Sequence, residues 1–294
     1  MSRFRLEWAR KCGERKAKEH GFTSFPIDPL IIAANEDIYV EAKKPDQAGV
    51  SGGIIFEENG VGIFYATNIA STGFQRFTIG HELGHYFLDG HPDEIMKLAP
   101  MHVSRAGFTE GSSSIEMEAD HFASGLLMPT RLVREALDQH QVGLVGVEQL
   151  AFMADCSLTA SAIRAAECSP YPMAVVVSRG ERVCYSFLSE GFKQLNPRNY
   201  LRKHDLLPES GTRVFNSDPS NIAQRRRSNA ETTLYEWFDG PAGTKLDEEI
   251  IGLGSYGFTL TLLSSEDLPA EPDETEDEEA ALIESYKLRF AYGR

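Results

Sequence analysis

The chain has 294 residues, of which 41% are hydrophobic and 25% are charged, and its formal net charge is −15. This composition is ordinary for a globular protein, and the sequence contains no apolar run that approaches the length of a membrane span. The negative charge argues against a protein that coats DNA without regard to sequence. The length allows two domains and a small third one.

The N-terminus and the cysteines both favour a cytoplasmic protein. Residues 1–7 are charged and amphipathic, and they contain no signal-peptide core. The four cysteines are scattered and lack the spacing of a zinc knuckle, which indicates reduced thiols in the cytosol. They are Cys12, Cys156, Cys168 and Cys184.

The first part of the chain predicts two helices and a small sheet. Residues 4–20 have apolar side chains at helical spacing, and Asp28 can cap a short helix that follows it. Residues 38–40 are a strand candidate. Residues 53–56 and 61–65 are apolar runs separated by a turn that ends in Asn-Gly, a pattern typical of a β-hairpin.

The most informative stretch is His81-Glu82-Leu83-Gly84-His85. Residues four apart lie on one face of a helix, so His81 and His85 can direct two imidazoles at one divalent metal ion. Glu82 would project beside that ion and could take a proton from water. Two imidazoles, one carboxylate and one open position make a catalytic zinc site, so the pattern predicts zinc. The alternative is a core helix that carries two histidines by chance.

A third ligand is expected downstream, where residues 114–128 predict a second helix that ends before Pro129. Glu116 and Asp120 lie one turn apart on one face of it. Glu116 is the predicted third ligand. Asp120 is the predicted partner that accepts the second ring N–H of a ligand histidine and fixes its tautomer. Glu118 competes with Glu116, but it points to the other side of the helix.

Two motifs carry a family resemblance: Arg76-Phe77-Thr78-Ile79-x-His81-Glu82-x-Gly84-His85, and Glu116-x-x-Ala119-Asp120-x-Phe122-Ala123-x-x-Leu126-Leu127-Met128-Pro129. Together they resemble the ImmA/IrrE family of zinc metallopeptidases, over roughly the first half of the chain. The resemblance implies a gluzincin-type site with His81, His85 and Glu116 as ligands and Glu82 as the base. It also implies cleavage of an XRE-type helix-turn-helix repressor, often in response to DNA damage.

In zincin-like enzymes the substrate adds as a strand to a sheet edge beside the active-site helix, and we expect the hairpin at 53–65 to supply that edge. Residues 89–113 join the two metal helices and are expected to form a wall or lid of the cleft. Tyr86 and His102 are candidate donors to the developing oxyanion of the substrate. His91 lies beyond the end of the first metal helix and is expected to be an exposed polar residue.

Residues 147–166 predict a helix, a turn and a second helix, and similar segments follow the peptidase in this family. Arg164 is the only cation on the second helix. Groove reading needs several polar or cationic side chains, so the pattern favours a packing or partner-docking role over DNA recognition.

The third part of the chain begins with a boundary near residues 169–172 and predicts an α/β sensor domain. Its strand candidates are residues 173–177, 182–188, 233–238 and 256–263. The family resemblance implies a GAF/PAS-like fold here. An acidic run at 266–279 predicts a solvated linker, and 280–290 a last helix or edge strand.

The predicted fold class is therefore α+β. Residues 1–130 form a zincin-like metallopeptidase domain, 131–168 a helix-turn-helix-like segment, and 169–294 a GAF/PAS-like sensor domain that includes the acidic linker.

One basic patch is predicted in the sensor domain, with aromatic residues interleaved. Cations and aromatic rings together can hold single-stranded nucleic acid, which makes single-stranded DNA a candidate activator. The alternative is a solvated loop that balances the acidic linker. The cations of the patch are Arg198, Arg202, Lys203, Arg225, Arg226 and Arg227.

Two functions of different class fit these patterns. The first is a zinc endopeptidase that cleaves a transcriptional repressor under the control of its sensor domain. The second is a non-catalytic, metal-binding regulatory protein that acts through its helix-turn-helix and sensor domains. Glu82 favours the first, because a structural metal site needs ligands but no base.

Overall fold

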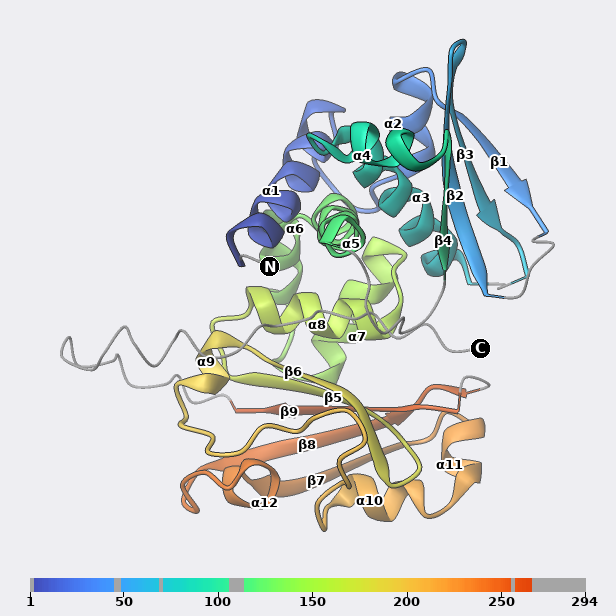
Figure 1. Cartoon of the computed structure of the whole chain (residues 1–294). Helices are drawn as coiled ribbons and strands as arrows, with labels where there is room; N and C mark the ends of the chain where they lie inside the picture. Colours follow the sequence, from blue (N-terminus) through green and yellow to red (C-terminus); the bar gives the residue numbers. More distant parts are fainter. Residues whose placement is uncertain (1–2, 45–48, 69–70, 106–113, 255–256, 266–294) are drawn as a thin grey trace.

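The computed structural model describes residues 3–44, 49–68, 71–105, 114–254 and 257–265 (Figure 1). They form a mixed α+β structure in two parts. Helices and a four-stranded sheet make up the first part, a five-stranded sheet and short helices make up the second, and α7 and α8 lie between them. The predicted acidic linker at 266–279 and the last element at 280–290 fall outside the described residues.

Five of the described helices belong to the first part, and four of them confirm sequence predictions. The short second helix is capped as expected, because the Asp28 side chain accepts a hydrogen bond from the Leu30 N–H group. The helices are α1 (Arg3–Glu19), α2 (Pro29–Asn35), α3 (Thr72–Phe87), α4 (His91–Leu98) and α5 (Ser114–Leu127). Helix α5 packs against α1 and against α3, and it thereby occupies the middle of this part.

The four-stranded sheet has the order β1-β3-β2-β4. Its strands are β1 (Tyr39–Lys43), β2 (Val50–Glu57), β3 (Gly60–Ala66) and β4 (Met101–Arg105). The predicted hairpin is confirmed as β2 and β3, which pair antiparallel. Its predicted role as the sheet edge is wrong, because β4 pairs with the outer side of β2 and β1 with the outer side of β3. The segment between the two metal helices thus supplies the edge strand.

The helical segment that follows consists of α6 (Thr130–Leu137), α7 (Leu144–Ala154) and α8 (Leu158–Cys168). Helices α7 and α8 confirm the predicted helix, turn and helix. Asp155 ends α7 in the left-handed region at φ 50°, and Ser157 caps α8. One hydrophobic core runs from α3 and α5 through these helices to the five-stranded sheet, so the two parts of the chain share buried contacts.

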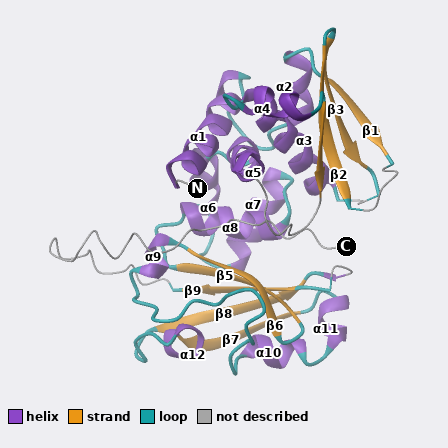
Figure 2. Ribbon diagram, viewed as in Figure 1, coloured by secondary structure: helices purple, strands orange, loops and turns teal. Residues whose placement is uncertain are grey.

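The second part is built on an antiparallel sheet of order β6-β5-β9-β8-β7 (Figure 2). Alternating residues of β5 face opposite cores: Val175 and Val177 pack with α6–α8, whereas Ala174 and Val176 pack with α9 and α12. The strands are β5 (Met173–Arg179), β6 (Arg182–Leu188), β7 (Arg227–Thr233), β8 (Lys245–Gly252) and β9 (Thr259–Ser264). The short helices are α9 (Glu190–Lys193), α10 (Gly211–Asn216), α11 (Pro219–Ala223) and α12 (Leu234–Phe238).

One predicted strand of this part is wrong. Residues 234–238 form helix α12, because Thr233 and Glu236 make a capping box: the Thr233 side chain accepts from the Glu236 N–H, and the Glu236 carboxylate accepts from the Thr233 N–H. The strand lies just before it, as β7, and β8 was not predicted. The aromatic residues after Thr233 favour a strand, but the local cap decides the structure.

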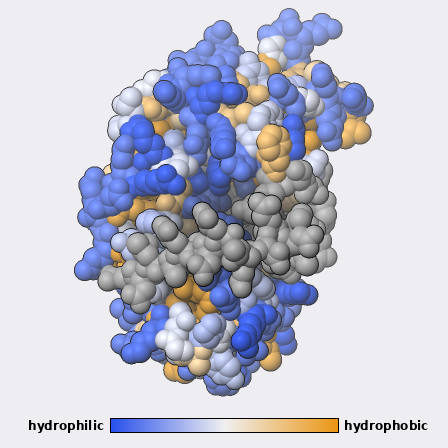
Figure 3. Space-filling view, turned by 90° about the vertical axis from the view of Figure 1, so that its left-hand side faces the viewer, coloured by the Kyte–Doolittle hydropathy of each residue, from blue (hydrophilic) through white to orange (hydrophobic). Residues whose placement is uncertain are grey.

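None of the described helices is long and apolar enough to cross a membrane. The face on the side of α1 is mostly hydrophilic over the first part of the molecule (Figure 3).

Arg164 joins the helical segment to the first part through a buried cluster of charges. It is 1% exposed, and its guanidinium donates to the Met128 carbonyl at 2.8 Å, to Glu167 at 2.6 Å and to Glu14 at 3.2 Å. These contacts tie α8 to α1 and to the end of α5. A buried cation cannot reach a phosphate group, and Arg164 is the only cation of α7 and α8, so it supports the packing role predicted for these two helices.

Replacing Arg164 by Leu should therefore lower the free energy of unfolding by about 3–5 kcal/mol, because Glu14 and Glu167 would lose a buried cation and the buried Met128 carbonyl would lose its donor. Urea unfolding followed by circular dichroism measures this change. The control is Arg131→Leu, which removes an exposed ion pair with Glu135 and should cost less than about 1 kcal/mol. Equal losses in the two variants would contradict the assignment of Arg164 as a buried tie.

Candidate metal centre

Helix α3 positions the first pair of functional side chains. The Ser71 hydroxyl caps its start by accepting a hydrogen bond from the Phe74 N–H group. Phe77 and Leu83 bury its apolar face, and His81 and His85 lie one turn apart, both at least nine-tenths buried. The cap and the burial fix the helix, and the helix fixes the spacing of the two imidazoles.

Small residues let α3 and α5 approach closely. A side-chain Cβ at Gly84 would lie 3.0 Å from the Ala119 Cα atom, and one at Gly80 would lie 3.4 Å from the Ala123 Cβ atom. Gly80 directly precedes His81 and Gly84 directly precedes His85, so both close contacts between the two helices lie beside the histidines. This approach brings Glu116 of α5 to the ring nitrogens of α3.

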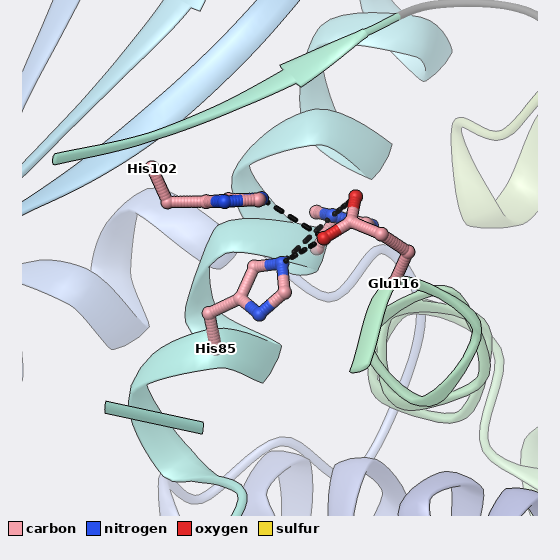
Figure 4. A group of neighbouring side chains, drawn as sticks. His85, His102 and Glu116 are labelled. Carbon is pink, nitrogen blue, oxygen red and sulfur yellow. Dashed lines mark hydrogen bonds and ion pairs between the residues drawn. The ribbon is translucent and has the colours of Figure 1, made fainter. Parts of the chain in front are cut away.

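Four side chains converge at one point between α3, α5 and β4 (Figure 4). The Nε2 atoms of His81 and His85 are 3.1 Å apart. The two oxygens of Glu116 lie 3.5 Å from His81 Nε2 and 3.2 Å from His85 Nε2, and one of them lies 2.9 Å from His102 Nε2. One donor atom from each residue can be chosen so that all four lie within 4.8 Å of one another.

The spacing of these atoms fits a zinc ion. Bonds of 2.0–2.1 Å in a tetrahedron place neighbouring donor atoms about 3.3 Å apart, and the separations between the four side chains scatter around that value. His102 Nε2 and the nearer Glu116 oxygen are close together, yet within the described residues neither makes an aligned hydrogen bond. Both atoms can therefore offer a lone pair to an ion that lies between them.

The electrostatics of the cluster also favour a cation. Burial lowers the pKa of His81, but hydrogen bonds to Asp120 and Glu116 outweigh it and leave that pKa well above its usual range. Burial also acts to raise the pKa of Glu116, but contacts with His102, His81 and His85 outweigh it and leave that pKa far below its usual range. Two carboxylates thus stabilise positive charge where a metal ion would lie.

The structure places Asp120 beside His81. Its carboxylate lies 2.8 Å from His81 Nδ1. A carboxylate at this nitrogen accepts the Nδ1–H bond, which leaves the Nε2 lone pair directed at the cluster. The helical spacing of Glu116 and Asp120 therefore serves one histidine from two sides.

Glu82 lies beside the cluster without a hydrogen-bond partner. The residue is fully buried, and no aligned hydrogen bond reaches either carboxylate oxygen from the part of the chain that is described. Burial raises the pKa of Glu82 to about 7, although the charge of His81 and the nearby Ser104 oppose the shift. A Cβ at Gly52 would come within 3.5 Å of Glu82 Oε1, so β2 closes this side of the carboxylate. A carboxylate with free lone pairs and a pKa near neutrality is suited to general-base chemistry.

The comparisons with known proteins agree with this geometry. Residues 35–153 match the family model Peptidase_M78, described as an IrrE N-terminal-like domain. The chain contains an M78 peptidase-family domain. The matched segment includes α3, β4 and α5, which carry all four converging side chains. The resemblance to the ImmA/IrrE family is thereby confirmed over this segment.

One solved structure is similar over most of the chain. It is a Mycobacterium tuberculosis transcriptional regulator, with a TM-score of 0.54 and 15% sequence identity, and the match covers 87% of this chain and 76% of that one. At this identity the likeness shows the fold alone. A search of curated proteins gave no match.

His102 of the M78 domain was predicted as an oxyanion donor, and the structure brings it into the cluster itself. It lies on β4, opposite Ile54 of β2. Its ring packs against the ring of His85, with centroids 4.6 Å apart. The sequence reasoning missed His102 as a candidate ligand. Side chains alternate between the two faces of a strand, so recognising residues 101–105 as a strand beside the metal helix could have identified His102 as a side chain that faces α3.

Tyr86 and His91 lie elsewhere than expected. Tyr86 packs among apolar residues on the far side of α3, where Glu36 and Lys16 are its charged neighbours, so it is not placed to donate to a substrate oxyanion. His91 was expected to be exposed but is 1% exposed. It begins α4 after a turn at Gly90 that points its ring back to His85. Burial lowers the pKa of His91, which keeps its ring neutral.

The predicted basic patch is not continuous. Arg202 and Lys203 lie along β6, where the Ser186 hydroxyl donates to the Leu201 carbonyl. The Arg198 N–H group donates to the Phe238 carbonyl at the end of α12, whereas Arg225–Arg227 lie where β7 begins. Strands β6 and β7 are the two opposite edges of the sheet. Arg227 also pairs with Glu148 of α7 at 2.6 Å. The six cations are therefore two separate exposed groups.

The close approach of α3 and α5 makes a prediction for two neighbouring glycines. Gly84→Ala would press a methyl group on the Ala119 backbone, and should destabilise the fold by about 1–3 kcal/mol and weaken zinc binding. Gly80→Ala meets only ordinary contacts, and its better helix propensity should leave stability within about 1 kcal/mol of the parent. Thermal unfolding and zinc titration measure both variants. Equal behaviour of the two would show that helix separation does not control the site.

Proposed function

We propose that the chain is a zinc-dependent endopeptidase. The observation that carries this proposal is Glu82, a buried carboxylate that has no hydrogen-bond partner in the described structure and lies beside three converging ligand residues. A structural zinc site has no use for such a group, and leaving it unpaired in the interior costs free energy. The peptidase-family match of residues 35–153 supports the same proposal.

Each residue of the cluster has a distinct role in this proposal. His81, His85 and Glu116 would hold zinc, which when bound supplies the Lewis acidity that polarises a peptide carbonyl and activates water. Asp120 holds His81 in the tautomer that has a free Nε2 lone pair. Glu82 takes a proton from water at its carboxylate and then delivers it to the nitrogen of the leaving amine.

We further propose an XRE-type helix-turn-helix repressor as the substrate. The sequence resemblance to repressor-cleaving peptidases supports this choice. The edge strand β4 supports a protein substrate, because among the described strands it pairs only with β2 and its outer edge can accept an extended segment. The α/β part at 169–265 would sense the signal, and its buried contacts with α6–α8 offer a route to the peptidase part.

A second candidate is a metal-binding regulator without peptidase activity. Two observations favour it. His102 supplies a fourth donor atom, and four protein ligands close a zinc site. The solved structure of similar fold is described as a transcriptional regulator. In this reading Glu82 would have no role, which makes its replacement the decisive test.

Glu82→Gln should retain zinc and the fold but reduce cleavage at least about 1,000-fold, because the amide cannot accept the proton. The full chain is incubated with helix-turn-helix repressors from the same genome, beginning with the one encoded next to it. Cleavage is followed by gel electrophoresis and mass spectrometry, and zinc by metal analysis.

The matched control is Glu94→Gln, an exposed glutamate of α4, which should cleave like the parent. Cleavage by Glu82→Gln near the parent rate would remove Glu82 as the base. A zinc-loaded parent that cleaves no repressor or unfolded protein would leave the regulator as the better account.

The proposal that single-stranded DNA is an activator can be tested on the two basic groups. We propose that Arg225, Arg226 and Arg227 bind it, so replacing all three by Ala should weaken binding, and binding should also weaken as salt rises. The matched control replaces Arg198, Arg202 and Lys203, the other exposed group. Fluorescence anisotropy with a labelled strand at two salt concentrations measures both. No binding at low salt, or equal binding by the parent and the first triple variant, would exclude this receiver.

A further inference from the structure

A second chain of polar contacts leads away from the metal cluster at His85. It runs from His85 through His91 and Glu118 to Arg5 of α1. His85 Nδ1 and His91 Nδ1 are 3.2 Å apart, and His91 Nε2 lies 3.4 Å from Glu118 Oε2. Arg5 donates to both oxygens of Glu118, at 3.2 and 2.5 Å.

We infer that Arg5, Glu118 and His91 are positioning residues that hold His85 in the tautomer that binds metal. The inference rests on the proposed function only in taking His85 as a zinc ligand. It gives roles to three residues that lie outside the motif of ligands and base. It also explains why Glu118, which does not reach the cluster, is only 4% exposed.

Arg5, at one end of the chain of contacts, determines the direction of its hydrogen bonds. A guanidinium can only donate, so the Glu118 carboxylate accepts from it and has oxygens left to accept from His91. His91 then carries its proton on Nε2, and its bare Nδ1 can only accept. His85 must therefore donate from Nδ1, which leaves a lone pair on Nε2. That lone pair points at Glu116 and His81, where the metal ion would lie.

The opposite direction is excluded by the same inventory of donors. If His85 carried its proton on Nε2, its Nδ1 would need a donor, and His91 would have to place its proton on Nδ1. His91 Nε2 would then face the Glu118 carboxylate with two acceptors in contact. Burial makes such a pair costly, since His91 is 1% and Glu118 4% exposed.

The two ligand histidines are thus supported by different means. Asp120 contacts His81 directly from the next turn of α5, whereas His85 reaches its carboxylate through an intervening imidazole. The indirect route uses α4, because His91 is its first residue and lies six positions after His85. It also ties the N-terminal helix to the site, since Arg5 is the half-exposed end of the chain of contacts.

The alternative is that Arg5 and Glu118 merely join α1 to α5. That role affects stability but not the ring of His85. A test therefore needs a variant that breaks the chain of contacts, a variant that breaks an equivalent buried contact elsewhere, and a readout on His85 itself.

The experiment uses the full chain and three variants. His91→Phe fills the ring volume without nitrogen atoms, and Glu118→Gln keeps the shape but loses the charge. Glu248→Gln is the matched control, because Glu248 is 1% exposed and caps α10 far from the cluster. Zinc affinity is measured by chelator competition. The tautomer of His85 is measured in metal-free protein from the ring ¹⁵N shifts, assigned with a His85 variant.

The inference expects His85 in the Nδ1–H form in the parent, and a mixture of tautomers in His91→Phe. It also expects zinc binding to be about 10–100-fold weaker in His91→Phe and Glu118→Gln but unchanged in Glu248→Gln. Arg5→Lys, which keeps a cation, should bind zinc more tightly than Arg5→Leu. Unchanged zinc affinity and unchanged ring shifts in His91→Phe and Glu118→Gln would overturn the inference.

These readouts separate this inference from the proposed function. If the parent binds zinc with His85 in the expected tautomer but cleaves nothing, the proposed peptidase activity is contradicted. The positioning role of Arg5, Glu118 and His91 is then still supported. If the parent is active and both His91→Phe and Glu118→Gln bind zinc as the parent does, only the positioning role is contradicted. If His91→Phe fails to fold, Glu118→Gln and the tautomer of the parent still decide the question.

Discussion

The site depends on how closely the backbones of α3 and α5 approach. Donor atoms on two helices can surround one ion only if the helices lie close together, because each histidine or glutamate side chain has a limited reach. Gly84 against Ala119 and Gly80 against Ala123 provide that separation. The remaining features of the first part, including the capped start of α3 and the packing of α1 on α5, hold this contact in place.

Given that contact, the chemistry is set by hydrogen bonds on the outer side of each ligand. His81 and His85 have equivalent positions in the motif but different support, direct from Asp120 and indirect through His91. Glu82 differs from all of them, because it lies beside the same centre and has no partner in the described residues. Hydrogen bonds thus fix the Nε2 lone pairs of His81 and His85 toward the metal position, whereas the Glu82 carboxylate keeps lone pairs that can accept a proton.

The sequence predicted the parts of the site that local spacing determines. His81 and His85 four apart, Glu116 and Asp120 four apart, and the cap at Asp28 all follow from helix geometry, and the structure has them. The remaining parts depend on contacts between distant segments. Nothing near His102 in the sequence shows that β4 would pair with β2, and nothing near His91 shows that a turn would return it to His85.

The second part of the chain shows the same limit. Its strands β5, β6 and β9 were predicted from apolar runs, whereas β7 and β8 carry many polar residues and were not. The sequence predicted one basic patch, because it does not show which strands lie at the edges of the sheet. Only the order of the sheet separates 198–203 from 225–227.

The central claim is that the converging side chains are a zinc site. X-ray absorption at the zinc edge of the full chain, loaded with one equivalent of zinc, tests it most directly. The account predicts nitrogen and oxygen donors at about 2.0–2.1 Å, with the outer-shell scattering of at least two imidazoles and no sulfur. A sulfur shell near 2.3 Å, or a six-coordinate oxygen shell without imidazole scattering, would place the ion elsewhere and contradict the claim.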